Sequence, residues 1–219
     1  MAEDSLEVFQ DLHLKTQGSP IDIRNAIVGQ IKEPWRHDQG REDSVGSQPD
    51  DAKNVLILNR VESDGIEAAS LVLWRRDSEY KVANIIPSTK SELGIRAYNA
   101  ILNDFVTQIA EPAKQVCTFE MKLTKSRETL DDWLSPGAAS DLRAFSASAN
   151  KLMSHPSDVA RWNRFLISMH SSRSQMDSSL LVRWLTEIDK WPEDRASELA
   201  IEYEFALELL RQYDQSKCP

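Results

Sequence analysis

The chain of 219 residues is 41% hydrophobic, which is enough apolar material to bury a substantial core. Its 35 acidic side chains outnumber 26 basic ones, and the formal charge is -9 at pH 7. Such a charge repels nucleic acid and anionic membranes unless a local basic patch intervenes, so we expect neither as a partner. The two cysteines, Cys117 and Cys218, are too few for a secreted disulfide scaffold or for a metal site of their own.

The first residues, MAEDSLEVFQDLHLKT, are acidic and lack the basic and apolar blocks of a signal peptide. No apolar run approaches the roughly 20 residues that are needed to cross a bilayer. These two features predict a cytoplasmic protein without a membrane segment.

Residues 6–15 alternate between apolar and polar side chains, which predicts a strand. Ser19 and Pro20 then suit the cap and the first turn of a short helix. The following segment 35–53, WRHDQGREDSVGSQPDDAK, combines clustered charge with two glycines and a proline. We expect a polar, mobile loop near residues 35–53, because this segment offers little apolar surface to bury.

Three apolar runs, at 55–61, 69–75 and 80–86, are separated by short turn segments and predict an antiparallel meander. The middle run carries Leu71 on one face and both Val72 and Trp74 on the other. Apolar side chains on both faces predict that this strand is covered on two sides.

A helical stripe of apolar residues runs from Leu93 to Ile109, with Ser91 as a suitable cap and Pro112 as its expected end. Residues 116–123 alternate again and predict a further strand. Residues 1–125 should therefore form one α+β domain.

Strand patterns stop after residue 125. Four or five segments with helical spacing follow, most of them begun by Ser or Asp, and Pro136 and Pro192 fit first-turn positions. The predicted fold class is α+β: an antiparallel β-meander with packed helices, followed by an all-α C-terminal region, residues 126–219, packed on it.

Motifs for catalysis, metals and cofactors are missing from the sequence. The four histidines, among them His37, His155 and His170, occur singly, without the spacing of a metal site or a nearby catalytic partner. Neither a GxSxG nucleophile elbow nor a glycine-rich phosphate loop is present. We therefore predict no metal ion and no cofactor.

Charge gathers in the last helical segment, where seven acidic residues and two arginines lie between Glu193 and Asp214. Glu198 and Glu202, and likewise Glu204 and Glu208, are four residues apart and share a helical face. This pattern is typical of a solvated surface, or of a docking surface for a basic partner.

Arginine beside tryptophan is a composition found at binding hot spots, and Trp74, Arg75 and Arg76 follow one another at the end of the middle strand. The same residues can instead cover a core with their long side chains. Trp35 opens the predicted polar loop, where it could fix the loop or meet a partner. Two other tryptophans, Trp162 and Trp184, fall on helical stripes that indicate a core, and the remaining two are Trp133 and Trp191.

Two hypotheses of function follow. The first is a non-enzymatic cytoplasmic interaction protein, antitoxin-like, immunity-like or regulatory, that binds a basic protein partner through an acidic surface. The alternative is an enzyme with a site in the cleft between the α+β unit and the helical region. Its candidate residues would be His37, His155, His170, Arg75 and Arg76. The sequence specifies neither the partner nor the oligomeric state.

Overall fold

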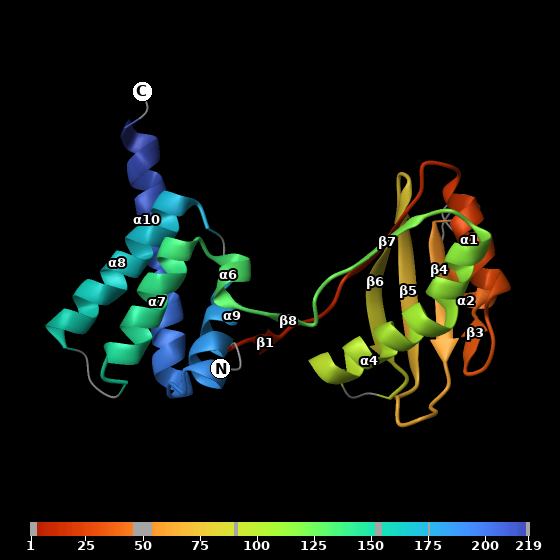
Figure 1. The fold of residues 1–219 in the computed structure, drawn as a ribbon, viewed down its shortest axis with the longest axis horizontal. Coiled ribbons are helices and arrows are strands. Elements are labelled where there is room, and N and C mark those ends of the chain that lie inside the picture. The colour runs from red at the N-terminus through yellow and green to blue at the C-terminus, as the bar shows by residue number, and fades with distance from the viewer. Residues whose placement is uncertain (1–3, 46–53, 90–91, 152–154, 175, 218–219) are drawn as a thin grey trace. The chain divides into compact units, whose positions relative to one another are not determined.

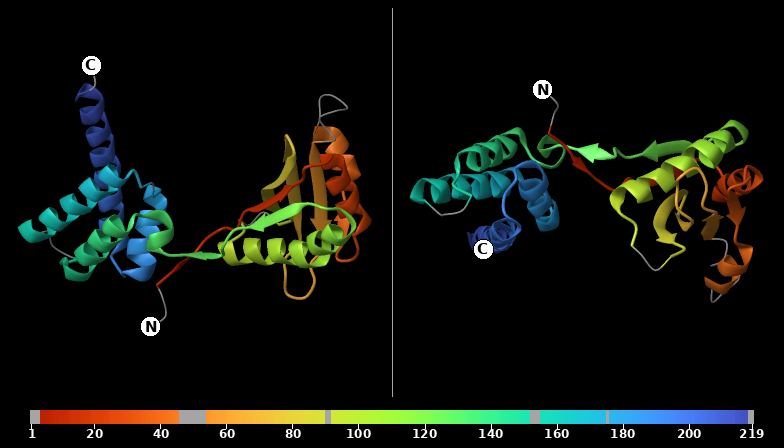
Figure 2. Two further views of the ribbon diagram at one scale, coloured as in Figure 1. Left: turned by 45° about the horizontal axis from the view of Figure 1, so that its top comes forward. Right: turned by 90° about the horizontal axis from the view of Figure 1, so that it is seen from below.

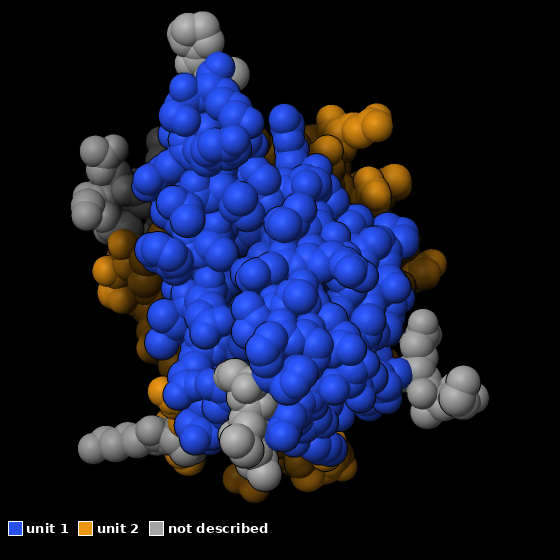
Figure 3. Space-filling view, turned by 90° about the vertical axis from the view of Figure 1, so that its left-hand side faces the viewer, with its two compact units in different colours: residues 1–6, 127–219 blue, residues 7–126 orange. Residues whose placement is uncertain are grey.

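The structure is a computed structural model that describes residues 4–45, 54–89, 92–151, 155–174 and 176–217. It contains two compact units, which Figure 3 colours separately. The sheet unit is Glu7–Ser126, and the helical unit combines Met1–Leu6 with Arg127–Pro219. The short strands β1 (Leu6–Glu7) and β8 (Arg127–Glu128) pair with each other where the chain passes from one unit to the other.

The sheet unit is built on one six-stranded sheet, ordered β3-β4-β5-β6-β2-β7, with antiparallel neighbours throughout (Figure 1). The predicted meander is confirmed in its three longest strands. The strands are β2 (Leu12–Lys15), β3 (Trp35–His37), β4 (Val55–Arg60), β5 (Ala69–Arg76), β6 (Glu79–Pro87) and β7 (Glu120–Leu123).

The sheet unit contains the two helices predicted from the sequence and also a helix within the segment predicted as a polar loop. Its helical elements are α1 (Pro20–Gly29), α2 (Gln39–Val45), α4 (Ile95–Phe105), the π-helical turn η1 (Val106–Ala110) and α5 (Glu111–Val116). Pro112 does not end the helix as predicted. The π turn changes the hydrogen-bond register, so Pro112 lies in the first turn of α5, where its missing N–H is tolerated. The predicted cap Ser91 lies outside the described residues.

One face of the sheet carries the core of this unit. Leu71 and Leu73 of β5 are fully buried and belong to one apolar cluster with Phe105 of α4, the helix that lies across the sheet (Figures 1 and 2). On the opposite face, Trp74 is 40% exposed and pairs across the strands with Lys81. The predicted cover of this second face is therefore incomplete: the β4 neighbours Val55 and Ile57 are buried, but Trp74 and Lys81 near the turn are exposed.

Helices make up most of the helical unit, as predicted. They are α6 (Leu130–Trp133), α7 (Pro136–Ser148), α8 (Pro156–Ser172), α9 (Ser178–Arg183), the π-helical turn η2 (Trp184–Ile188) and α10 (Glu193–Lys217). Ser135 caps α7 by accepting a hydrogen bond from the Ala138 N–H, and Pro136 follows it in the first turn. No helix in the described part of the chain is long and apolar enough to cross a membrane.

Aromatic side chains dominate the core of the helical unit. Trp162 and Trp184 are buried, which confirms the interpretation of their helical stripes as core, and Trp191, which lies outside the helices, is buried as well. The rings of Trp191 and Phe145 stack with their centroids 5.3 Å apart, and the Trp191 indole N–H donates to the Ser146 hydroxyl at 2.7 Å. The core thus satisfies this polar group while it excludes water.

The side chain of Asp189 is half-buried beside this aromatic core. Burial raises the pKa of Asp189 above its usual value of 3.8, an effect that Ser146, Lys151 and Trp184 partly oppose and Asp4 reinforces. A carboxyl with a raised folded-state pKa contributes stability at low pH that is lost as the pH rises through that pKa. The charged form therefore costs stability near neutral pH.

We expect the Asp189→Asn variant to gain in free energy of unfolding relative to the wild type as the pH rises from about 4 towards 7. Denaturant unfolding at several pH values, followed by tryptophan fluorescence, measures this difference. The exposed Asp194→Asn variant is the control. If the wild type and Asp189→Asn have parallel pH profiles, the carboxyl does not carry the proposed cost.

Candidate functional site

A groove of about 670 Å³ lies between the end of α8, the α8–α9 connection and α10, all within the helical unit. Its floor is apolar and its rim is rich in carboxylates, and we call it the acidic groove. The floor consists of Met169, Met176, Tyr203 and Leu207, and the carboxylates of the rim belong to Asp177, Glu204, Glu208 and Asp214.

The groove exists because α10 is longer than the core that packs against it. In the first half of α10, Ala196, Leu199 and Tyr203 are buried at helical spacing. Beyond Tyr203, α10 contains no further fully buried residue within the described range, and Figure 1 shows this end of the helix extending away from its neighbours. The side of α10 that would face a core there lines the groove instead.

Hydrogen bonds fix the floor and one wall of the groove. The Tyr203 hydroxyl donates to the Met176 carbonyl at 2.7 Å, and burial raises the pKa of this hydroxyl, which keeps it protonated. Asp177 accepts a hydrogen bond from the Ser179 N–H at 2.8 Å at the start of α9. Hydrogen bonds from the Ser179 side chain and backbone lower the pKa of Asp177, so this carboxylate is ionised at neutral pH.

The rim as a whole is negative at neutral pH. Glu208 pairs with Arg211, and Asp214 lies 2.7 Å from the Nε2 atom of His170. Glu204 accepts a hydrogen bond from the Ser178 hydroxyl. With Arg173, the lining thus contains four carboxylates against two arginines and one histidine. Each carboxylate has room for more donors than these, because an ionised carboxylate can accept about four hydrogen bonds.

The four glutamates singled out in the sequence do not share one surface. Glu204 and Glu208 line the acidic groove, whereas Glu198 pairs with Arg195 and Glu202 lines a separate small pocket. Glu202 and Glu204 lie about 200° apart around the helix axis, at about 100° per residue. Their spacing along the chain indicated the pairs correctly, but only the packing of α10 shows which pair faces the groove.

Asp177 and Asp214 are rim residues that sequence reasoning missed as site members. Asp177 precedes α9 as its N-cap, and Asp214 lies near the end of α10. A capping signal at Asp177 was available in the sequence, but a cap indicates only the start of a helix. Their closeness to Glu204 depends on how α9 and α10 pack.

The other predicted partner-binding residues lie in the sheet unit. Trp74 and Arg76 are exposed near the β5–β6 turn, and Arg75 is half-buried there. Trp35 is different: it is 1% exposed, its ring packs on Phe105, and its indole N–H donates to Asp104 at 2.8 Å. The role of surface anchor suggested for Trp35 is therefore wrong, because no surface of its ring is available to a partner.

The predicted polar loop near 35–53 also needs correction. Residues 35–37 form β3 and residues 39–45 form α2, while residues 46–53 lie outside the described residues. Two buried side chains, Trp35 and Glu42, fix the segment to the rest of the unit. The overall polarity of the segment concealed these two anchors.

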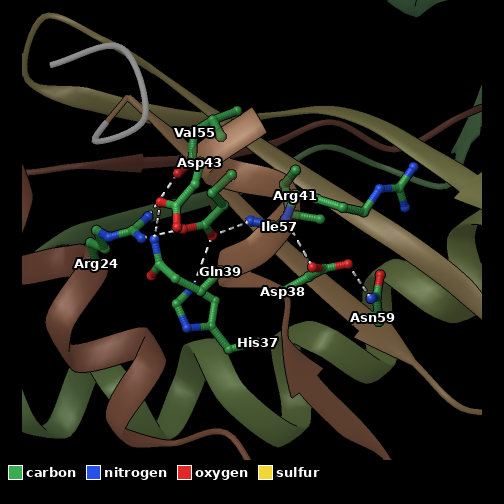
Figure 4. Close-up of polar contacts among 10 residues, drawn as sticks. Arg24, His37, Asp38, Gln39, Arg41, Asp43, Val55, Ile57 and Asn59 are labelled. Carbon is green, nitrogen blue, oxygen red and sulfur yellow. Dashed lines mark hydrogen bonds and ion pairs between the residues drawn. The ribbon is translucent and has the colours of Figure 1, made fainter. Parts of the chain in front are cut away.

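A buried polar cluster surrounds Glu42 (Figure 4). Its Oε1 atom accepts a hydrogen bond from the Ile57 N–H at 2.7 Å and lies 2.9 Å from the Nε2 atom of His37. Its Oε2 atom pairs with Arg24, which also donates to the Val55 carbonyl at 2.7 Å. Both carboxylate oxygens are thus occupied by donors from the protein itself.

This cluster completes the edge of the sheet. Strand β3 pairs with β4 only from Leu58 to Arg60, which leaves the preceding residues of β4 without a strand partner on that side. Side chains replace the missing strand there: Arg24 donates to the Val55 carbonyl, and Glu42 accepts from the Ile57 N–H. The Asp38 N–H donates to the Ile57 carbonyl at 2.9 Å. Buried backbone groups need such partners, so the cluster is best explained as structural.

The histidines proposed for an enzyme have separate partners. His37 contacts Glu42, His155 caps α8 through the Ser157 N–H at 3.2 Å, and His170 contacts Asp214. Within the described ranges, no group of three or more His, Cys, Asp or Glu side chains could hold a metal ion.

No known protein family, curated protein or solved structure matches the chain. The geometry of the molecule itself is therefore the basis on which its function is inferred. Of the two polar sites, the acidic groove has carboxylates with room for further donors, whereas the Glu42 carboxylate is buried and both of its oxygens are engaged by the protein itself.

The Glu42→Ala variant should lose about 3–5 kcal/mol of unfolding free energy, because it leaves Arg24 as a buried charge without its partner. The Ile57 amide should also exchange its hydrogen faster. Denaturant unfolding and hydrogen exchange measure both effects. Asp43→Ala, an exposed change in the same helix, is the matched control. Equal unfolding midpoints for the two variants would show that the cluster is not structural.

Proposed function

We propose that the protein is a non-enzymatic cytoplasmic interaction protein, antitoxin-like, immunity-like or regulatory, whose acidic groove binds a basic segment of a partner protein. The observation that carries the proposal is the combination of four carboxylates with an apolar floor in one groove. Carboxylates form strong, charge-assisted hydrogen bonds with lysine and arginine, and an apolar floor accommodates the stems of these side chains.

The size and composition of the groove support a peptide segment as its ligand. About 670 Å³ falls in the range of sites that enclose a ligand of small-molecule or short-peptide size. Met169 and Met176 are themselves buried, so the floor is a packed apolar surface beneath the carboxylates. The carboxylates would select basic residues.

The salt bridges already present in the rim support a reversible, salt-sensitive interaction. Arg211 and His170 hold Glu208 and Asp214 in place, so a partner would meet carboxylates that are partly ordered. Exposed charge pairs are screened by salt, and binding through them weakens as the ionic strength rises.

The enzyme hypothesis has less support. His37 is tied to a carboxylate whose two oxygens are engaged by structural donors, and His155 serves as a helix cap. Only His170, in the rim of the acidic groove, lies in an open site. Its neighbour Asp214 would be the one candidate to orient it.

The test compares two doubly substituted proteins with the wild type, each tagged and purified from the native host at low and at moderate salt. Glu204→Gln with Glu208→Gln removes two charges from the groove. Glu193→Gln with Glu202→Gln removes the same number from α10 outside it. Mass spectrometry identifies and quantifies any co-purified protein.

We expect the wild type and the outer variant to retain the same basic partner at low salt and the groove variant to lose most of it. The partner should dissociate as salt is raised. Equal loss from both variants would show that net charge matters and the groove does not. The absence of a stoichiometric partner from every preparation would overturn the proposal.

A further inference from the structure

The outer side of α10 exposes a row of large apolar side chains. Ile201 and Phe205 are each 69% exposed, Leu209 is 54% exposed and Tyr213 is 55% exposed. Single exposed apolar residues are ordinary on protein surfaces, but a continuous row marks an interaction site. These four residues form what we call the outer ridge.

The outer ridge is separate from the acidic groove. Phe205 lies about 200° around the helix axis from Tyr203, which forms part of the groove floor. None of the four ridge residues lines the groove. A ligand of the groove would therefore leave the ridge uncovered, and the ridge requires a different partner.

We propose that the outer ridge pairs with the same ridge of a second copy of this chain, with the two α10 helices antiparallel. This inference goes beyond the proposed function and does not depend on it. A two-fold symmetric pair requires a surface that is complementary to itself, so that each contact occurs twice.

The sequence of the ridge meets this requirement. An antiparallel pair centred between Phe205 and Leu209 sets Phe205 against the partner's Leu209. The same register sets Ile201 against the partner's Tyr213, so apolar side chains meet only apolar side chains. Four apolar residues on each helix then form a continuous dry seam.

The charges at the two ends of the ridge also match. Lys217 continues the ridge one step beyond Tyr213, and its ammonium group lies 4.1 Å from the centre of the Tyr213 ring. Antiparallel pairing brings it near the partner's Glu198, which lies beside the other end of the ridge. A basic segment from another protein would meet Lys217 with a like charge, which favours a second copy as the occupant.

Acidic neighbours of the ridge are partly neutralised within the chain. Glu208 pairs with Arg211 and accepts a hydrogen bond from Gln212 at 2.8 Å. The antiparallel register places the partner's Gln212 opposite Glu202. The glutamine side chain is uncharged and can donate a hydrogen bond to the glutamate. Repulsion between the two acidic helices is therefore small at the seam.

The spacing of the ridge determines the geometry of the pair. Residues four apart form ridges that are inclined to the helix axis, and two such ridges interdigitate when the helices cross at about -50°. This crossing keeps all four residues of each ridge along the line of contact. It is the commonest class of helix packing in globular proteins.

Sedimentation of the full-length protein over a range of concentrations tests the proposal. The wild type should be a dimer that dissociates on dilution. Phe205→Glu should raise the dimer dissociation constant roughly thirtyfold or more, as expected for a central aromatic residue of an interface. Ile167→Glu, on α8 and 57% exposed, is the matched control and should leave the dimer intact.

A charge exchange tests the antiparallel register. Lys217→Glu and Glu198→Lys should each weaken the dimer, and the double variant should restore it. Circular dichroism shows whether each variant keeps its helices. A wild-type monomer at every concentration, an equal effect of Ile167→Glu, or a double variant without recovery would overturn the proposal.

This test is independent of the acidic groove. Glu204→Gln, which changes the groove but not Glu208 beside the ridge, should sediment as the wild type does, whether or not it binds a partner. If instead the wild type is monomeric and a basic partner is lost on substitution of Phe205, the ridge binds another protein and the second-copy proposal fails.

Discussion

The length of α10 relative to the core beneath it is the constraint from which both candidate surfaces arise. The helix runs from Glu193 to Lys217, but Tyr203 is the last of its residues that is fully buried in the described range. In the further turns, Ala206 and Leu207 pack only partly against the core, and other apolar side chains are exposed. On the inner side Leu207 becomes part of the acidic groove, and on the outer side Phe205 and Leu209 form the ridge. A solvent-exposed helix that keeps apolar residues on both sides indicates more than one contact.

The sheet unit presents the opposite situation, in which a charged group is used for folding. Glu42 brings α1, α2 and β4 together by binding Arg24, His37 and the Ile57 N–H. A buried carboxylate is costly unless it is paired and fully hydrogen-bonded, and this one is. The buried Glu42 therefore explains why β3 can end early while the backbone groups of β4 beyond it still have hydrogen-bond partners. It does not provide a free base for catalysis.

Much of the architecture was predictable because periodicity is a local property. Alternating runs identified β4, β5 and β6, and helical spacing identified α7, α8 and α10. Failures came where one or two residues outweigh the composition of their segment. Trp35 and Glu42 are buried within a segment whose other residues are polar, so the segment resembled a loop. In β5 the apolar pattern suggested cover on both faces, but on the second face this cover ends near the turn, where Trp74 is 40% exposed beside Lys81.

The sequence by itself determined the α+β class, the meander followed by a helical region and the excess of acidic charge in α10. Each depends on residues that are close in the chain. Only the tertiary structure decided that Glu204 and Glu208 join Asp177 and Asp214 around one groove, and that Glu198 and Glu202 do not. Helical spacing places residues on one face of a helix, but the packing of α8, α9 and α10 determines which face of α10 lines the groove. Contacts between distant segments leave no local pattern in the sequence. For that reason the acidic groove could not be predicted from the sequence.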